Sequence, residues 1–309
     1  MRSLRDLDDF IEHNGVEDIG ALLRGRVRHC FHLYQDSDAK DRPGASRLGG
    51  LPDLPAGTAW PCCDDQIPEF IAQLDLEQIT RVHGASALPR HGTLSIFAVT
   101  AHDPPRRPAV AIHIPSGVTL VRRPAPAGVR VFNPVLIRLE PGITLPIEEA
   151  LFDAVVDEMA PDFDPSDISQ ATWGGRNCLG QLLGHPVTFR DDLLSQAALD
   201  ALGHPDAARL LIWPSWEKWL EARQISSTMA NGVIYRPWVE DDDEEMRWLL
   251  ENRERIANEI EQWQVLFKVS SNREMDFWIN DADDLYLFIR NNDLEAGRFS
   301  RLRTGETQS

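Results

Sequence analysis

The chain of 309 residues has few cysteines and no long apolar run. Its four cysteines include no Cys-x-x-Cys pair, which argues against a disulfide framework. No apolar stretch reaches the roughly 18 residues that a membrane span requires. The first ten residues carry acids where a signal peptide needs an apolar segment. These absences predict a cytoplasmic protein with reduced thiols and no contact with membranes.

Known catalytic and cofactor motifs are also missing. The chain has no nucleophile elbow, zinc-protease motif or dinucleotide-binding motif. Gly175 and Gly180 have the spacing of a phosphate loop, but Gln181 stands where that loop needs lysine. Residues 280–284 alternate acids but lack the glycine and distal glutamate of a calcium loop. The sequence predicts no cofactor and no metal, and it leaves enzyme activity open because catalytic groups can come from distant positions.

Basic residues are scarce relative to acidic ones, 31 against 49, so the formal net charge is −18. A surface this acidic repels nucleic acid and favours cationic partners. One span, 104–138, is the reverse and has six arginines and no acid: Arg106, Arg107, Arg122, Arg123, Arg130 and Arg138. These arginines either neutralise acidic groups within the molecule, which we favour, or bind an anion such as a phosphate or carboxylate.

Hydrophobic periodicity predicts the secondary structure. Ser3–Gly25 reads as two short helices, the first capped by Ser3. Residues 27–34 alternate as a strand, which places His29 on the face opposite Cys30 and His32 and argues against a metal site there. We expect further strands at 70–76 and 92–99, paired antiparallel, and at 109–114, 118–121 and 129–139. Helices are predicted at 146–159 and at about 242–263.

An acidic run stands at the start of the last predicted helix: Glu240, Asp241, Asp242, Asp243, Glu244 and Glu245. Negative charge at a helix start is stabilised by the helix dipole. A solvated helix start is therefore the simpler interpretation, but six consecutive acids exceed what a dipole requires. These six residues are the candidate binding surface for a basic protein partner.

Three sequence blocks recur in the same order and predict two related halves. Residues 48–52 are echoed by 182–186, residues 70–76 by 265–269, and residues 92–97 by 283–288. The predicted fold is α+β and β-rich, with mainly antiparallel sheets from two related halves and helices packed outside. The predicted divisions are 1–45 (N-terminal helices and strand), 46–165 (first half), 166–300 (second half) and 301–309 (flexible tail).

The recurring blocks resemble the bacterial YwqG-like family, a family named as a domain of unknown function. The resemblance rests on Gly49–Pro55, Trp60-Pro61, Phe70–Leu76 and Leu88–Phe97, and it extends over most of residues 46–300. The chain departs from the pattern at Phe267-Lys268-Val269. The family implies an α+β, β-rich bacterial cytoplasmic protein and no established activity.

Two functional hypotheses follow. The first is a non-enzymatic module that binds and neutralises a basic protein, as toxin-immunity proteins do, because charge complementarity speeds such capture. The second is a small-ligand binder or enzyme with a site in the cleft between the halves. Its candidate ligand-binding residues are Arg47, Trp60, Gln73 and Asp283. The sequence does not indicate the oligomeric state.

Overall fold

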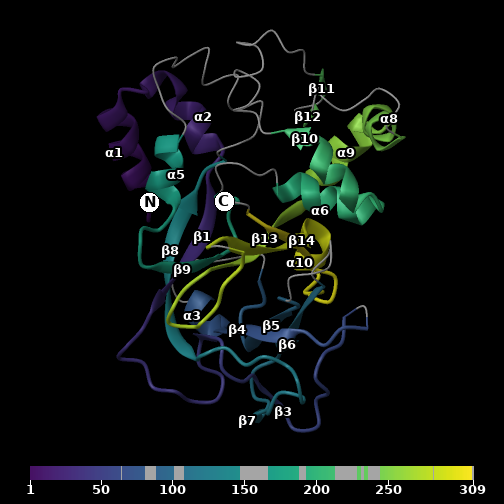
Figure 1. The fold of residues 1–309 in the computed structure, drawn as a ribbon. Helices are drawn as coiled ribbons and strands as arrows, with labels where there is room; N and C mark the ends of the chain where they lie inside the picture. Colours follow the sequence, from purple (N-terminus) through teal and green to yellow (C-terminus); the bar gives the residue numbers. More distant parts are fainter. Residues whose placement is uncertain are drawn as a thin grey trace.

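The computed structural model describes residues 1–63, 65–80, 88–100, 108–146, 166–187, 193–212, 228–230, 233–235, 244–280 and 282–307. Ten antiparallel strands form one large sheet (Figure 1). They are β1 (Arg28–Gln35), β2 (Arg47–Leu48), β4 (Glu69–Asp75), β5 (Thr93–Ala98), β6 (Ala109–Ile114), β8 (Val135–Thr144), β9 (Cys178–Leu182), β13 (Trp263–Ser270), β14 (Asp284–Arg290) and β15 (Arg303–Glu306).

The strand order is β15-β14-β13-β9-β1-β8-β2-β4-β5-β6. The sheet curves until its two edges approach each other: the backbone N–H of Ala111 in β6 donates to the carbonyl of Phe299, just before β15, at 2.9 Å. Apolar side chains from strands near both edges fill the enclosed face, among them Ile96 of β5 and Leu287 of β14. The sheet is therefore nearly closed around one apolar core, to which strands near both of its edges contribute, whereas the N-terminal helices pack in a separate cluster.

Helices and two smaller sheets surround the large sheet (Figure 1). The helices are α1 (Leu4–Asn14), α2 (Gly20–Gly25), α3 (Leu76–Thr80), α5 (Ser166–Thr172), α6 (Leu193–Leu202), α8 (Glu244–Glu251), α9 (Arg253–Ile260) and α10 (Asn291–Glu295). Strands β3 (Asp53–Pro55) and β7 (Leu120–Arg122) pair with each other, and so do β10 (Leu211–Ile212), β11 (Thr228–Ala230) and β12 (Val233–Tyr235). No helix among the described residues is long and apolar enough to cross a membrane.

The strand order is the same from either end, so that β2, β4, β5 and β6 correspond to β9, β13, β14 and β15. Details of the backbone also correspond. The pairing of β4 shifts between Phe70 and Ala72, and that of β13 shifts between Val265 and Phe267. The chain then takes two successive positive φ angles after β2 and again after β9, at Gly49-Gly50 and Leu183-Gly184.

By strand order, one half comprises β1, β2, β4, β5 and β6, and the other comprises β8, β9, β13, β14 and β15. The first strand of each half pairs with strands of the other half. β1 precedes β2 in the chain but pairs with β9, whereas β8 precedes β9 but pairs with β2. β1 and β8 also pair with each other at the centre of the sheet. The two halves therefore share one sheet rather than forming two separate ones.

Several sequence predictions are confirmed. Ser3 caps α1, and its hydroxyl accepts from the N–H of Asp6 while the Asp6 carboxylate accepts from the N–H of Ser3. The strands predicted at 70–76 and 92–99 pair antiparallel as β4 and β5. Residues 109–114 form β6, and β1 occupies the alternating stretch after α2. The β-rich, mainly antiparallel fold class is also confirmed.

Other predictions were wrong in their boundaries. The strand predicted at 129–139 begins only at Val135, after Pro134, which has no N–H to donate to a sheet. The long helix predicted from Asp242 to Trp263 is two helices separated at Asn252, and Trp263 instead begins β13. Trp263 is buried there with Val265, and this period-2 pattern decides in favour of a strand. The helix predicted at 146–159 lies outside the described residues after Pro146.

Candidate functional site

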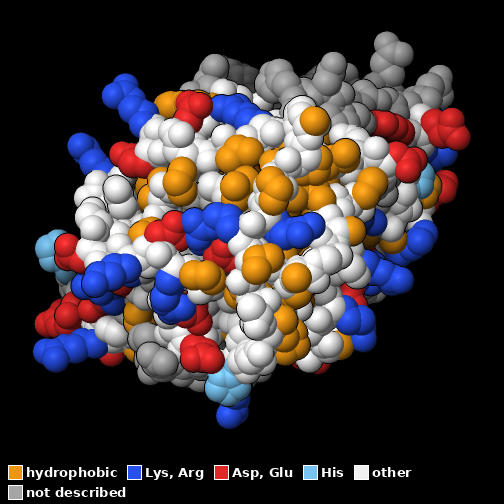
Figure 2. Space-filling view, turned by 90° about the horizontal axis from the view of Figure 1, so that it is seen from below, with side chains coloured by type: hydrophobic (Ala, Val, Ile, Leu, Met, Phe, Trp, Pro, Cys, Tyr) orange, Lys and Arg blue, Asp and Glu red, His pale blue; other side chains and the backbone are white. Residues whose placement is uncertain are grey.

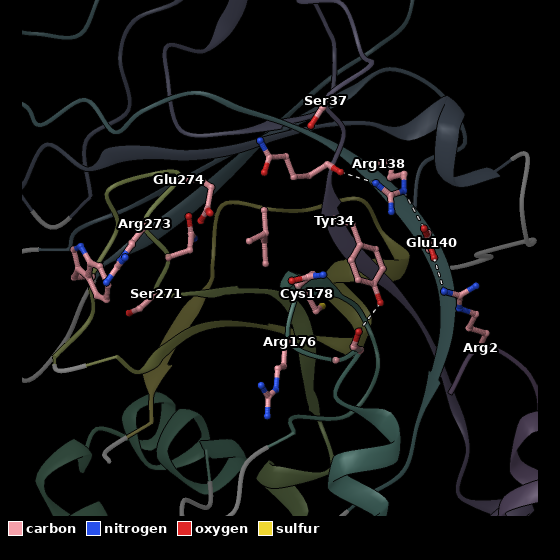
Figure 3. A pocket seen from close by; sticks show the side chains of 17 residues that line it. Arg2, Tyr34, Ser37, Arg138, Glu140, Arg176, Cys178, Ser271, Arg273 and Glu274 are labelled. Carbon is pink, nitrogen blue, oxygen red and sulfur yellow. Dashed lines mark hydrogen bonds and ion pairs between the residues drawn. The ribbon is translucent and has the colours of Figure 1, made fainter.

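A pocket of about 910 Å³ opens beside the central strands (Figure 3). β1, β8 and β9 form one side, and the turns that flank β9 and β13 form the other. Its charged and aromatic lining residues include Tyr34, Arg138, Glu140, Arg176, Arg273 and Trp278. This volume suits an ordinary small-molecule ligand.

The pocket lies where the two halves meet. Arg47 of β2 pairs with Leu136 of β8, and the corresponding Gln181 of β9 pairs with His32 of β1. Leu136 of β8 and His32 of β1 therefore occupy corresponding positions. Two residues further along the same strands are Arg138 and Tyr34, which also correspond and which pair directly with each other. Tyr34 and Arg138, which both line the pocket, therefore mark the point about which the two halves are related.

The side chains around Tyr34 already have partners. The Tyr34 hydroxyl donates to the carbonyl of Gly174 at 2.7 Å, and burial raises the pKa of Tyr34 to about 12. Arg138 donates to Glu140 at 2.9 Å and places its guanidinium 5.4 Å from the Tyr34 ring centroid. Arg2 lies 3.5 Å from the other oxygen of Glu140. This side of the pocket is a fixed polar wall.

Two other arginines of the lining have no ion-pair partner among the described residues. Arg176 precedes β9 and Arg273 follows β13; both are exposed, and neither forms an ion pair with any described residue. Figure 3 shows Arg273 and Glu274 across the pocket from Tyr34 and Arg138. The full lining holds four arginines and two glutamates, so it is locally positive in an acidic protein.

Cys178 lines the pocket, and the buried His32 lies beside another lining residue, Gly174. The Cys178 thiol donates to the carbonyl of Gly180 at 3.1 Å, and burial raises its pKa. His32 is buried, its Nε2 has no hydrogen-bond partner among the described residues, and burial lowers its pKa to about 4. Both groups are neutral at pH 7, which argues against a thiolate nucleophile. No group of three or more potential metal ligands occurs within the described part of the chain.

A family model described as Domain of unknown function (DUF1963) matches residues 46–305. The chain belongs to this family. The DUF1963 match covers β2 through most of β15 and leaves the N-terminal helices and β1 outside it. Most of the pocket lining thus lies within the family match, whereas four lining residues precede it: Arg2, Tyr34, Gln35 and Ser37. A comparison with curated proteins finds no match.

Within the DUF1963 match, the four predicted ligand-binding residues do not line the pocket. Arg47 and Gln73 do come together, because both contact the buried Asp53, Arg47 at 2.7 Å. Trp60 donates to the carbonyl of Pro68 at 2.8 Å and packs edge-on against Phe97. Asp283 is buried and accepts from the hydroxyl of Thr307 at 3.3 Å. Each of these side chains already has a partner within the protein.

The predicted partner surface is described only in part. Glu244 and Glu245 begin α8, and the other four acids of the run lie outside the described residues. Of the arginines in span 104–138, Arg122 binds Asp53 at 3.0 Å and Arg130 binds Asp276 at 3.2 Å. Acidic and basic side chains lie side by side on the face that Figure 2 shows. These pairs fit internal neutralisation, the interpretation that the sequence favoured.

Sequence reasoning missed Arg176 and Arg273 because both lie in turns, outside the periodic segments. One signal was present. Gly174-Gly175 brings two positive φ angles immediately before Arg176, and such turns are common where a chain approaches a site. That signal marks a sharp turn but not the direction in which the arginine points.

Proposed function

We propose that this protein binds a small anionic ligand in the pocket between its halves. The observation that carries the proposal is the pair of exposed arginines, Arg176 and Arg273, which have no described partner and stand on separate turns of one cavity. Guanidinium groups bind phosphates and carboxylates through paired hydrogen bonds. This proposal is the small-ligand hypothesis from the sequence, placed at different residues.

The corresponding region of the first half supports the proposal. There, Arg42 in the turn before β2 binds Asp75 at the end of β4, at 3.0 Å. The residue of β13 that corresponds to Asp75 is Ser270, because Lys268 corresponds to Gln73. The second half therefore keeps an arginine, Arg176, in the turn before β9 but lacks the acid that would neutralise it. We also propose that the two halves arose by internal duplication, followed by this divergence.

The test is calorimetric titration of the full chain with inorganic phosphate, citrate and ribose 5-phosphate. We expect at least one of these anions to bind. The double variant Arg176→Ala/Arg273→Ala should weaken that binding by at least tenfold, because a hydrogen bond to a charged group contributes about 1.5–3 kcal/mol. The matched control is Arg301→Ala, which removes an exposed arginine that does not line the pocket. Absence of binding, or equal loss in the control, would contradict the proposal.

A second candidate function is the capture of a basic protein partner, as in toxin-immunity pairs. The net charge of −18 supports it, and so does the position of Glu244, which is exposed at the start of α8 next to the acidic run. The test is a pull-down from the native host, eluted over a salt gradient. A stoichiometric basic protein released by salt would support this candidate, and a bare protein at every salt concentration would count against it.

A further inference from the structure

We infer that the ligand carries a planar aromatic ring in addition to its anionic group. This inference rests on the proposed anion site. Its evidence is Trp278, which lines the pocket and is 45% exposed although its neighbours Phe277 and Ile279 are buried. Trp173, 44% exposed, immediately precedes the lining residue Gly174. Large side chains left open to water beside a cavity commonly mark a binding surface.

The turn that carries Trp278 is held firmly in place. The backbones of Asn272 and Phe277 exchange two hydrogen bonds, at 2.9 and 3.1 Å. The Ser271 hydroxyl accepts from the N–H of Ile279 at 2.9 Å. The carbonyl of Met275 accepts from the N–H of Asn133 at 2.9 Å, which ties the turn to the segment before β8. The indole is therefore exposed from a fixed backbone, and a ligand would not have to order this turn.

The same turn also supplies Arg273, so one rigid segment presents an aromatic face and a cation to the pocket. An indole face stacks on planar rings, and base–aromatic stacking contributes about 1–3 kcal/mol per base. A sugar alone would need matched donors and acceptors. Among the uncommitted charged groups, Arg176 and Arg273 are donors and only Glu274 is an acceptor. This composition fits an anion joined to a ring, as in nucleoside phosphates or aromatic carboxylates.

The test compares ligand pairs that differ by the ring. Calorimetry on the full chain would measure AMP against ribose 5-phosphate and benzoate against acetate. In at least one pair, we expect the ring-bearing member to bind at least tenfold tighter. Trp278→Ala should remove that preference and leave the affinity for the ringless member within twofold. Trp278→Phe should keep most of the preference, because phenylalanine retains a stacking face.

Each outcome separates this inference from the proposed function. Equal affinity within both ligand pairs would contradict the inferred aromatic ring. If that binding still needs Arg176 and Arg273, the proposed anion site stands. A ring preference that survives Trp278→Ala would also overturn the inference. If no anion of any kind binds, the proposed function fails and this inference fails with it. Circular dichroism and the melting temperature of Trp278→Ala would show that the variant is folded.

Discussion

The two halves hold the same turn with different side chains. In the first half, Arg47 donates to the carbonyl of Leu51 at 2.7 Å. In the second half, Gln181 occupies the corresponding position and donates to the carbonyl of His185, the counterpart of Leu51, at 2.9 Å. A cation and a neutral amide thus satisfy the same backbone group. The backbone requirement is shared, whereas the side-chain chemistry differs.

The segment after the turn shows the same contrast. The N–H of Asp53 donates to the Gln73 side chain at 2.9 Å, whereas the N–H of the corresponding Val187 donates to the Tyr286 hydroxyl at 3.2 Å. The first half buries the Asp53 carboxylate, which forms ion pairs with both Arg47 and Arg122. The second half leaves arginines open at its pocket. The second half also buries an ion pair, Lys268 with Asp284 at 2.7 Å, so the two halves differ in the exposed arginines, which the proposed function assigns to the ligand.

The largest expected effect comes from Asp53→Ala in the first half. Burial alone would raise the pKa of Asp53, but hydrogen bonds from Arg122 and Arg47 hold it below its ordinary value. Removing this carboxylate leaves Arg47, which is 1% exposed, without its closest counter-charge. We expect a loss of about 3–5 kcal/mol in the free energy of unfolding, measured by urea denaturation.

The control for that prediction is Asp8→Ala, which removes an acid from an exposed pair with Arg24 in a helix that accepts alanine. Exposed ion pairs contribute about 0–1 kcal/mol. If both variants lose the same free energy of unfolding, the buried network of Asp53, Arg47 and Arg122 has no special role in stability. The contrast drawn between the two halves would then be wrong.

The next effect concerns the turn itself. Gly49 has a φ of +61°, and a Cβ there would lie 2.3 Å from the carbonyl oxygen of Asn133. Gly49→Ala should therefore cost about 2–4 kcal/mol of unfolding free energy, from the contact together with the strained backbone. Gly57→Ala is the matched control, since Gly57 also has a positive φ of +83° but nothing within 4 Å of its Cβ position. A cost in the control equal to that at Gly49 would show that backbone conformation alone decides.

The smallest effect is a pH dependence at the seam between the halves. Because burial lowers the pKa of His32 to about 4, the folded state resists protonation that the unfolded chain accepts near 6.5. The stability supported by the neutral ring is complete above pH 6.5 and falls as the pH decreases toward 4, by at most about 1.4 kcal/mol per unit. His32→Leu, which installs the residue of the corresponding position Leu136, should flatten that slope.

Urea denaturation at pH 7, 6 and 5 would measure this slope. The exposed His13 provides the control His13→Leu, which should leave the slope as it is in the unmodified protein. His185, whose pKa burial lowers to about 3, keeps part of the slope in both variants. An unchanged slope in His32→Leu would contradict the assignment of this proton to His32.

Much of the fold could be predicted because its signals are local. Alternation identified β4 and β5, and the Ser3 cap with Asp6 located α1. The recurring blocks fall on corresponding strands and turns of the two halves. The pairing of β1 with β9 could not be predicted, since nothing in a strand's own pattern states which distant strand it will meet.

The candidate site was harder to predict for the same reason. Arg47 and Gln73 are polar residues in a sheet, and the sequence cannot show whether such groups face a cavity or each other. In the structure, both contact Asp53. The uncommitted groups, Arg176 and Arg273, become recognisable only when β9 and β13 are placed side by side. Tertiary placement, rather than residue type, decides which arginine is free.

The crossing of β1 and β8 has a consequence for how the chain is made. When β1 leaves the ribosome, neither of its neighbours exists yet: β8 begins at Val135, and β9 ends at Leu182. One edge of β1 therefore waits for β8, which ends at Thr144, and the other waits for β9, which is complete only after more than half of the chain has been synthesised. Unpaired strand edges promote association between chains. A nascent chain halted between the halves should be a target for chaperones, although the finished sheet leaves β1 no free edge.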